Sequence, residues 1–130
     1  MAINSRVNSR AKGIRFERQL CQILSEATGK VITRNWKEQT AVGGYDLDGL
    51  EKFAIEVKAC KEISVGKWWE QTKEQANKAN KIPLLAYKPM QMPWVFVLEL
   101  KLINPNIESE QLLEMKLDAF IQVVKFHNLI

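Results

Sequence analysis

Residues 53–60, FAIEVKAC, alternate between apolar and other side chains with a period of two, which is the period of a β-strand. One row is apolar and would pack against a helix; it consists of Phe53, Ile55 and Val57. The opposite row consists of Ala54, Glu56, Lys58 and Cys60. This pattern requires a sheet that has one face covered by a helix and that places Glu56 next to Lys58 on the other face.

The preceding segment, YDLDG, predicts the partner strand of a hairpin. If the turn is centred on Glu51, Asp46 lies directly opposite Glu56, and their Cβ atoms are about 4.5–5.5 Å apart. The alternative is a tight turn at Asp48-Gly49, which would move Asp46 away from Glu56.

Two opposed carboxylates repel each other unless a cation lies between them. Mg²⁺ prefers oxygen ligands and would bridge Asp46 and Glu56 while keeping several waters. Lys58, on the same face, could hold an attacking water or neutralise a phosphate oxygen. For this fragment alone, the ordinary explanation has more weight, because Glu and Lys on a half-solvated strand often simply face water.

The other elements follow from hydrophobic periodicity and from Gly and Pro residues. A helix is predicted at 9–28, with Ser9 as its cap and Gly29 as its stop. Further helices are predicted at about 67–80 and at 107–126, strands at 31–37, 84–88 and 94–100, and a glycine-containing loop at 39–44. The order α-β-β-β-α-β-β-α predicts an α/β sandwich with a mixed sheet.

The chemistry available to the chain is narrow. His127 is the single histidine, so histidine-based nuclease sites, zinc sites with paired histidines and Ser-His-Asp hydrolysis are excluded. Cys21 and Cys60 have no companions at zinc spacing, and Cys60 is expected to be a small buried apolar residue. Hydrolysis would therefore have to use carboxylates, lysine and a hard metal ion.

Composition indicates a soluble protein in a reducing cytoplasm. The 130 residues fit one domain, 46% of them are hydrophobic, and the sequence predicts neither a membrane span nor a secretory signal. The net charge of +4 permits a polyanionic partner. Basic residues concentrate within the first 18 residues: Arg6, Arg10, Lys12, Arg15 and Arg18. Residues 1–10 of this segment are expected to form a basic arm. Such an arm suits phosphate contacts, although a solvated terminus is the ordinary explanation.

Asp46, followed after nine residues by Glu56-Val57-Lys58, resembles the signature of the PD-(D/E)XK nuclease superfamily. More narrowly, the chain resembles the Holliday-junction resolvases of archaea and bacteriophages. Tyr45 stands where the superfamily name has proline, and the hairpin is shorter than in the archaeal proteins. The similar segments run in order along the chain: KGIRFER (12–18), GGYDL (43–47), IEVK (55–58), WWEQ (68–71) and PLLAYK (83–88).

The resemblance implies a restriction-endonuclease-like fold, in which one nuclease domain over 1–130 has a central mixed sheet flanked by helices. It implies metal ligation by Asp46, Glu56 and the Val57 carbonyl, with Lys58 as the catalytic lysine. The remaining implied site residues are Glu17, which would complete the acidic cluster, and Gln71 at the rim, with Gln75 as the other candidate. Their ordinary roles would be a surface ion pair for Glu17 and solvation for the glutamines.

The implied activity is Mg²⁺-dependent hydrolysis of phosphodiester bonds in four-way DNA junctions by a homodimer, with Mn²⁺ as a substitute, in the bacterial host cell if the chain is phage-encoded. The dimer interface is expected from apolar residues of WVFVLEL (94–100) and the C-terminal helix, and at least one of Trp68 and Trp69 is expected in the core. The alternatives are a repair or restriction-like nuclease and a DNA-binding module that does not cut. The expected DNA-binding residues are Arg6, Arg10, Lys12, Arg15 and Lys88.

Overall fold

The computed structural model describes residues 2–35, 44–59 and 61–130, with side chains from Arg10 onward. A six-stranded mixed sheet has the strand order β1-β2-β3-β4-β5-β6. Its strands are β1 (Thr33–Arg34), β2 (Leu47–Asp48), β3 (Phe53–Lys58), β4 (Ile82–Tyr87), β5 (Val95–Glu99) and β6 (Leu112–Met115). The helices are α1 (Ala2–Thr28), α3 (Val65–Ala79), α4 (Leu100–Ile103) and α5 (Leu117–Phe126). The predicted α/β class with a mixed sheet is therefore confirmed.

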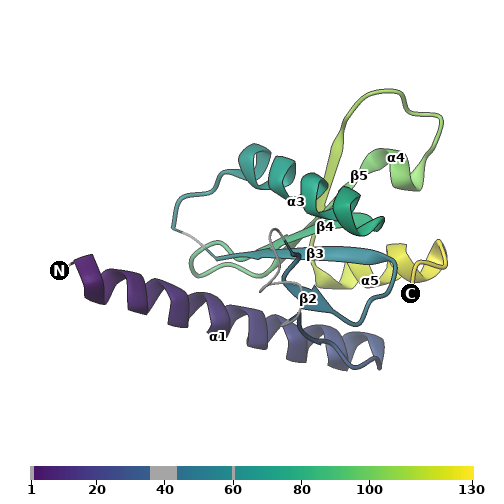
Figure 1. Ribbon diagram of the computed structural model, residues 1–130. Coiled ribbons are helices and arrows are strands. Elements are labelled where there is room, and N and C mark those ends of the chain that lie inside the picture. Colours follow the sequence, from purple (N-terminus) through teal and green to yellow (C-terminus); the bar gives the residue numbers. More distant parts are fainter. Residues whose placement is uncertain (1, 36–43, 60) are drawn as a thin grey trace.

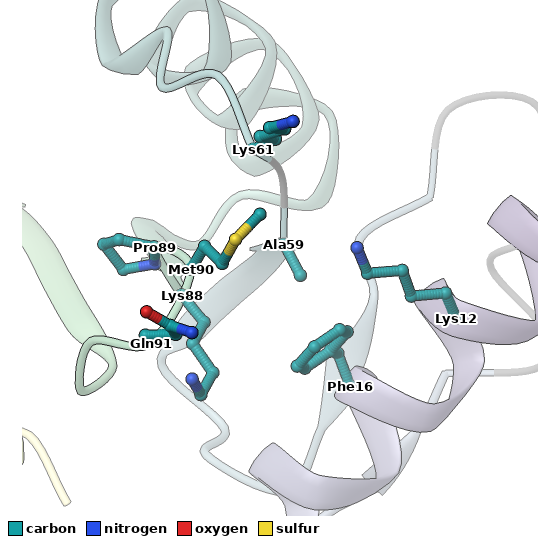
Figure 2. Close-up of a pocket in the computed structure, with 8 residues that line it drawn as sticks. All are labelled: Lys12, Phe16, Ala59, Lys61, Lys88, Pro89, Met90 and Gln91. Atoms are coloured by element: carbon teal, nitrogen blue, oxygen red, sulfur yellow. The ribbon is translucent and has the colours of Figure 1, made fainter.

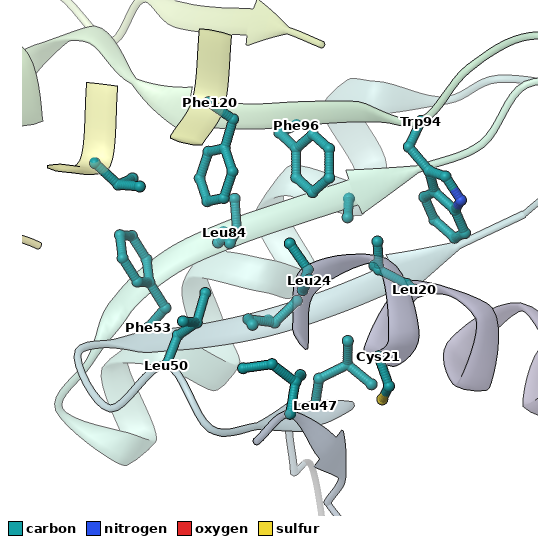
Figure 3. Packing of buried hydrophobic residues seen from close by; sticks show 14 of the residues in the cluster. Leu20, Cys21, Leu24, Leu47, Leu50, Phe53, Leu84, Trp94, Phe96 and Phe120 are labelled. Carbon is teal, nitrogen blue, oxygen red and sulfur yellow. The ribbon is translucent and has the colours of Figure 1, made fainter. Parts of the chain in front are cut away.

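Helices cover both faces of the sheet (Figure 1). On one face, α1 and α5 bury the larger core, in which the rings of Phe96 and Phe120 stack at 4.7 Å (Figure 3). On the other face, α3 packs through Trp68 and Trp69, which are both buried against Leu85 and other residues of β4 and β5. Burying each large apolar side chain stabilises the fold by about 1.5–3 kcal/mol.

The predicted alternation of β3 is confirmed. Phe53 and Ile55 belong to the core beneath α1 and α5, whereas Ala54 packs against Ala76 of α3. Glu56 therefore lies on the α3 face, because side chains two residues apart share a face of a strand. This face is the one that carries the candidate site.

The hairpin also has the register predicted for a turn centred on Glu51. Leu47 pairs with Ile55, so that Asp46 stands opposite Glu56. The Phe53 N–H donates to the Leu50 carbonyl at 2.9 Å and closes the turn there, not at Asp48-Gly49. Gly49 is required for a different reason. Its φ of 127° is one that other residues rarely adopt, and a Cβ atom at this position would clash with the Val31 carbonyl.

The prediction of one helix at 107–126 is wrong in its first half. Residues 112–115 form β6, which pairs antiparallel with β5, and α5 begins at Leu117. The spacing of Leu113 and Leu117 suits a helix, but pairing β6 with β5 satisfies the main-chain groups that β5 would otherwise expose along its edge. Tertiary pairing therefore outweighs the local pattern.

This pairing also overturns the interface expected from residues 94–100. Both edges of β5 are paired, and Trp94, Phe96 and Leu98 are buried within the chain's own core. These side chains are not available to a partner.

The N-terminal segment differs from the expected arm. Helix α1 begins at Ala2 instead of at Ser9, so residues 2–10 are helical. No glycine or proline precedes Gly13, and the local sequence therefore contains nothing that would stop the helix earlier. Residues 36–37 of the first predicted strand, residues 39–43 of the predicted loop and Cys60 lie outside the described residues.

No helix formed by the described residues is long and apolar enough to cross a bilayer.

Candidate active site

Glu56 lies in β3, and Asp46, which directly precedes β2, is held beside it by contacts with the main chain of β3. The Asp46 N–H donates to the Ile55 carbonyl at 2.8 Å, and its carboxylate Oδ2 accepts from the Val57 N–H, also at 2.8 Å. Lys58, at the end of β3, places its Nζ 3.5 Å from Glu56 Oε1. The strand pairing therefore brings the two carboxylates and the lysine together, as the sequence predicts.

Burial makes this carboxylate pair difficult to ionise. Glu56 is only 4% exposed, and burial, followed by the neighbouring Asp46 charge, raises its pKa to about 8. Burial also raises the pKa of Asp46 to about 6, although the hydrogen bond from Val57 opposes this shift. A buried and a half-buried carboxylate, both with raised pKa values, form a site that a cation would stabilise in the charged form.

Helix α3 adds a glutamine to the pair. With its amide nitrogen turned toward these acceptors, Gln75 donates to Glu56 Oε2 at 2.6 Å and to the Gly44 carbonyl at 3.1 Å. Gln71, the residue favoured by sequence, is exposed one helical turn away. The close packing of Ala76 and Ala54 sets which turn of α3 faces β3, and sequence spacing alone does not contain this information.

Comparison with known proteins agrees with this geometry. The family described as "Phage putative PDDEXK endonuclease" matches residues 8–128. The chain belongs to this endonuclease family.

The family assignment is accompanied by a structural likeness. The solved structure of Hjc from Archaeoglobus fulgidus, a Holliday junction resolvase from an archaeal hyperthermophile, is similar with a TM-score of 0.51 and 22% identity. The similarity covers 90% of this chain and 96% of that chain, and it supports the restriction-endonuclease-like fold. No curated protein matches the chain.

Within this family fold, Glu17 of α1 approaches the carboxylate pair from the other side. Its charge helps to raise the pKa of Asp46, so it lies within electrostatic reach of that carboxylate. Glu17 Oε2 also accepts from Arg34 Nε of β1 at 2.7 Å, and the two side chains are only 14% and 10% exposed. Glu17 is therefore not an exposed helix residue. Turning its carboxylate toward a ligand would break the ion pair with Arg34.

Sequence reasoning missed Arg34 and Asn35. Asn35 is buried, its Nδ2 donates to the Tyr45 carbonyl at 3.1 Å, and its N–H donates to the Asp46 carbonyl at 2.9 Å. These contacts hold the chain on both sides of the Asp46 Cα. The only available signal was the polar run Thr-Arg-Asn inside a predicted strand, which does not identify partners ten or more residues away.

The donor set fits a hard divalent cation, the kind of metal that PDDEXK nucleases generally use. Asp46 and Glu56 offer carboxylate oxygens, which Mg²⁺ prefers over nitrogen or sulfur. Among the described residues, no group of three His, Cys, Asp or Glu side chains surrounds a common point. Main-chain oxygens, waters or a substrate phosphate would therefore complete the coordination, which is usual for Mg²⁺.

The predicted DNA-binding residues lie on α1 and after β4. The Lys12 Nζ and the Arg15 guanidinium each lie 5.9 Å from the centre of the Phe16 ring, and both side chains are exposed. Lys88 is half-buried, and its Nζ donates to the Met92 carbonyl at 3.0 Å. Arg10 is exposed, whereas the side chain of Arg6 lies outside the described part of the chain.

Proposed function

We propose that the chain is a metal-dependent DNA endonuclease that resolves four-way junctions. The observation that carries this proposal is the pair of carboxylates, the buried Glu56 and the half-buried Asp46, held opposite each other beside Lys58. Two ionised carboxylates this close repel each other, so the protein alone disfavours their charged form. A bound cation would offset this repulsion.

In this proposal, Asp46, Glu56 and the main-chain carbonyl of Val57 hold Mg²⁺, with Mn²⁺ as a substitute. When bound, the cation supplies Lewis-acid polarisation of the scissile phosphate and stabilises the leaving oxygen. Asp46 is already oriented for this task, because its Oδ2 accepts a hydrogen bond from the Val57 N–H at 2.8 Å.

Lys58 and Gln75 have different tasks. The Lys58 ammonium, 3.5 Å from Glu56, orients the attacking water or neutralises a phosphate oxygen. Gln75 is a positioning residue that orients the Glu56 carboxylate through its amide hydrogen bond. The sequence resemblance favoured Gln71 for the rim of the site, and we now assign this role to Gln75.

The junction preference is supported by likeness to Hjc, which is a Holliday junction resolvase. Membership in a phage endonuclease family also supports action in the cytoplasm of a bacterial host cell. Resolving a junction requires cuts in two strands, and a two-fold dimer would supply one site for each strand. The competing proposal is a family nuclease that cuts other DNA, whereas the complete set of Asp46, Glu56 and Lys58 argues against a module that only binds.

The protein should cut four-way junctions in preference to linear duplex of the same sequence. We expect a dimer at micromolar concentration, paired cuts placed symmetrically about the branch point, and nicked duplexes as products. Sedimentation gives the oligomeric state, and gel analysis of end-labelled strands gives the positions of the cuts. Equal cutting of junction and duplex, or a monomer under these conditions, would favour the general nuclease while leaving the metal site unaffected.

A further inference from the structure

A pocket of about 110 Å³ lies between α1 and the segments that follow β3 and β4 (Figure 2). It lies at the carboxyl ends of two parallel strands, because Ala59 directly follows β3 and Lys88 directly follows β4. Ligands of open α/β sheets bind at this end of the strands. The residues that matter for its chemistry are Lys12, Phe16, Lys61, Lys88, Met90 and Gln91.

The charge of the pocket selects an anion. Lys12, Lys61 and Lys88 come from three separate segments, and no carboxylate belongs to the described residues that line the pocket. Three positively charged side chains that line one small volume repel one another, and an anion between them relieves that repulsion. Lys12 and Lys61 are exposed, so both are accessible to a large polyanion such as DNA.

The pocket is joined to the candidate site by the main chain. Ala59 is the residue after Lys58, about 3.3 Å further along the strand direction. The Lys88 N–H donates to the Lys58 carbonyl at 2.9 Å, which ties the second wall of the pocket to the same residue. One wall of the pocket therefore begins within one residue of Lys58, although the side chains of Lys58 and Ala59 point to opposite faces of the strand.

The opposite wall is apolar and shaped by an unusual turn. The Phe16 ring points into the pocket and is supported edge-on by Trp94, at 6.2 Å between ring centres. Met90 is 55% exposed, and Gln91 adopts a left-handed φ of 61° that a glycine would adopt without strain. Strained residues of this kind gather at binding sites, where the position of the side chain matters.

We propose that this pocket binds the backbone phosphate next to the scissile phosphate in the strand that is cut, with Phe16 and Met90 against the deoxyribose. The pocket is small, about 110 Å³, and a phosphate is the smallest repeating anionic group of a DNA strand. This proposal rests on the proposed cutting of DNA and adds which part of the strand is held.

The test combines changes in the protein with changes in the DNA. Single phosphates on both sides of the cut position, mapped with Mg²⁺, are replaced one at a time by neutral methylphosphonates in a four-way junction and in a linear duplex. Binding is then measured without divalent metal, so that the result does not depend on catalysis. For the wild-type protein, neutralising the phosphate adjacent to the cut should weaken binding about tenfold, because charge-assisted contacts are lost.

The double variant Lys12→Ala/Lys61→Ala should bind unmodified DNA about tenfold more weakly than the wild type. Neutralising the phosphate adjacent to the cut should weaken the binding of this variant no further. The exposed Lys125, on α5, provides the control, since Lys125→Ala removes a positive charge outside the pocket and should keep the wild-type response. Thermal unfolding confirms that each variant is folded.

The proposal is overturned if the double variant responds to every methylphosphonate as the wild type does, or if the coupled phosphate lies away from the cut. If the protein cuts no DNA, the phosphates nearest the branch point are replaced instead, and a double variant that alone loses the response at one of them would refute the proposed function while leaving a phosphate-binding pocket.

Discussion

Replacing Glu56 with Gln, or Asp46 with Asn, should abolish DNA cleavage while DNA binding survives. Each change removes one of two carboxylates that stand opposite each other, Asp46 directly before β2 and Glu56 in β3. The Lewis-acid contribution of a catalytic metal is several kcal/mol, so the loss should be at least about a thousandfold in rate. Because each change also removes negative charge near the phosphate, affinity should hold or increase. Cleavage rates at saturating Mg²⁺ and dissociation constants without metal measure the two effects separately.

The same hairpin offers matched controls. Asp48 and Glu51 are exposed, so Asp48→Asn and Glu51→Gln make the same chemical changes away from the carboxylate pair. Both controls should cut at close to the wild-type rate. Near wild-type cutting by either site variant, or an equal loss in the controls, would refute the assignment of Asp46 and Glu56.

Glu56→Gln should also stabilise the metal-free protein above neutral pH. In the folded protein the pKa of Glu56 is raised from 4.5 to about 8, so the folded state binds more protons than the unfolded state between these values. The free energy of unfolding of the wild type therefore decreases as pH rises through this window. A neutral side chain of the same shape does not ionise, and the variant should gain on the order of 1–3 kcal/mol over the wild type at about pH 8.

Urea denaturation in the presence of a chelator, at about pH 5 and about pH 8, measures this difference. The gain should shrink toward the acid end, where Glu56 is protonated in the folded wild type. Glu51→Gln, which changes an exposed carboxylate in the turn, should show no comparable gain. A variant less stable than the wild type at about pH 8 would mean that the Glu56 charge is already compensated by its protein neighbours.

The predicted hairpin and the structure agree because local rules decide that region. The period of two in β3 sets which side chains share a face, and the turn at Leu50–Phe53 sets the register that brings Asp46 opposite Glu56. Both rules operate within about ten residues of chain. The core of the candidate site could therefore be predicted from a short segment.

The features that sequence reasoning missed depend on contacts between distant segments. The leucine spacing of residues 112–115 predicts a helix, but their pairing with β5 outweighs this local pattern and makes them strand β6. The orientation of α3 about its axis, as it packs on β3, determines that Gln75 and not Gln71 reaches Glu56. The contact of Glu17 with Arg34 depends in the same way on the packing of α1 against β1. None of these contacts leaves a periodic signal in the chain.

The central claim is that Asp46 and Glu56 hold a divalent cation with which this endonuclease cuts DNA. The measurement that tests it most directly is cleavage of an end-labelled four-way junction by the wild-type protein, with Mg²⁺ titrated into chelator-treated protein. We expect no cutting in chelator, cutting that rises and saturates with Mg²⁺, and restoration by Mn²⁺. Cutting that continues at the same rate in chelator, or its absence with both metals on junction and duplex alike, would contradict the claim.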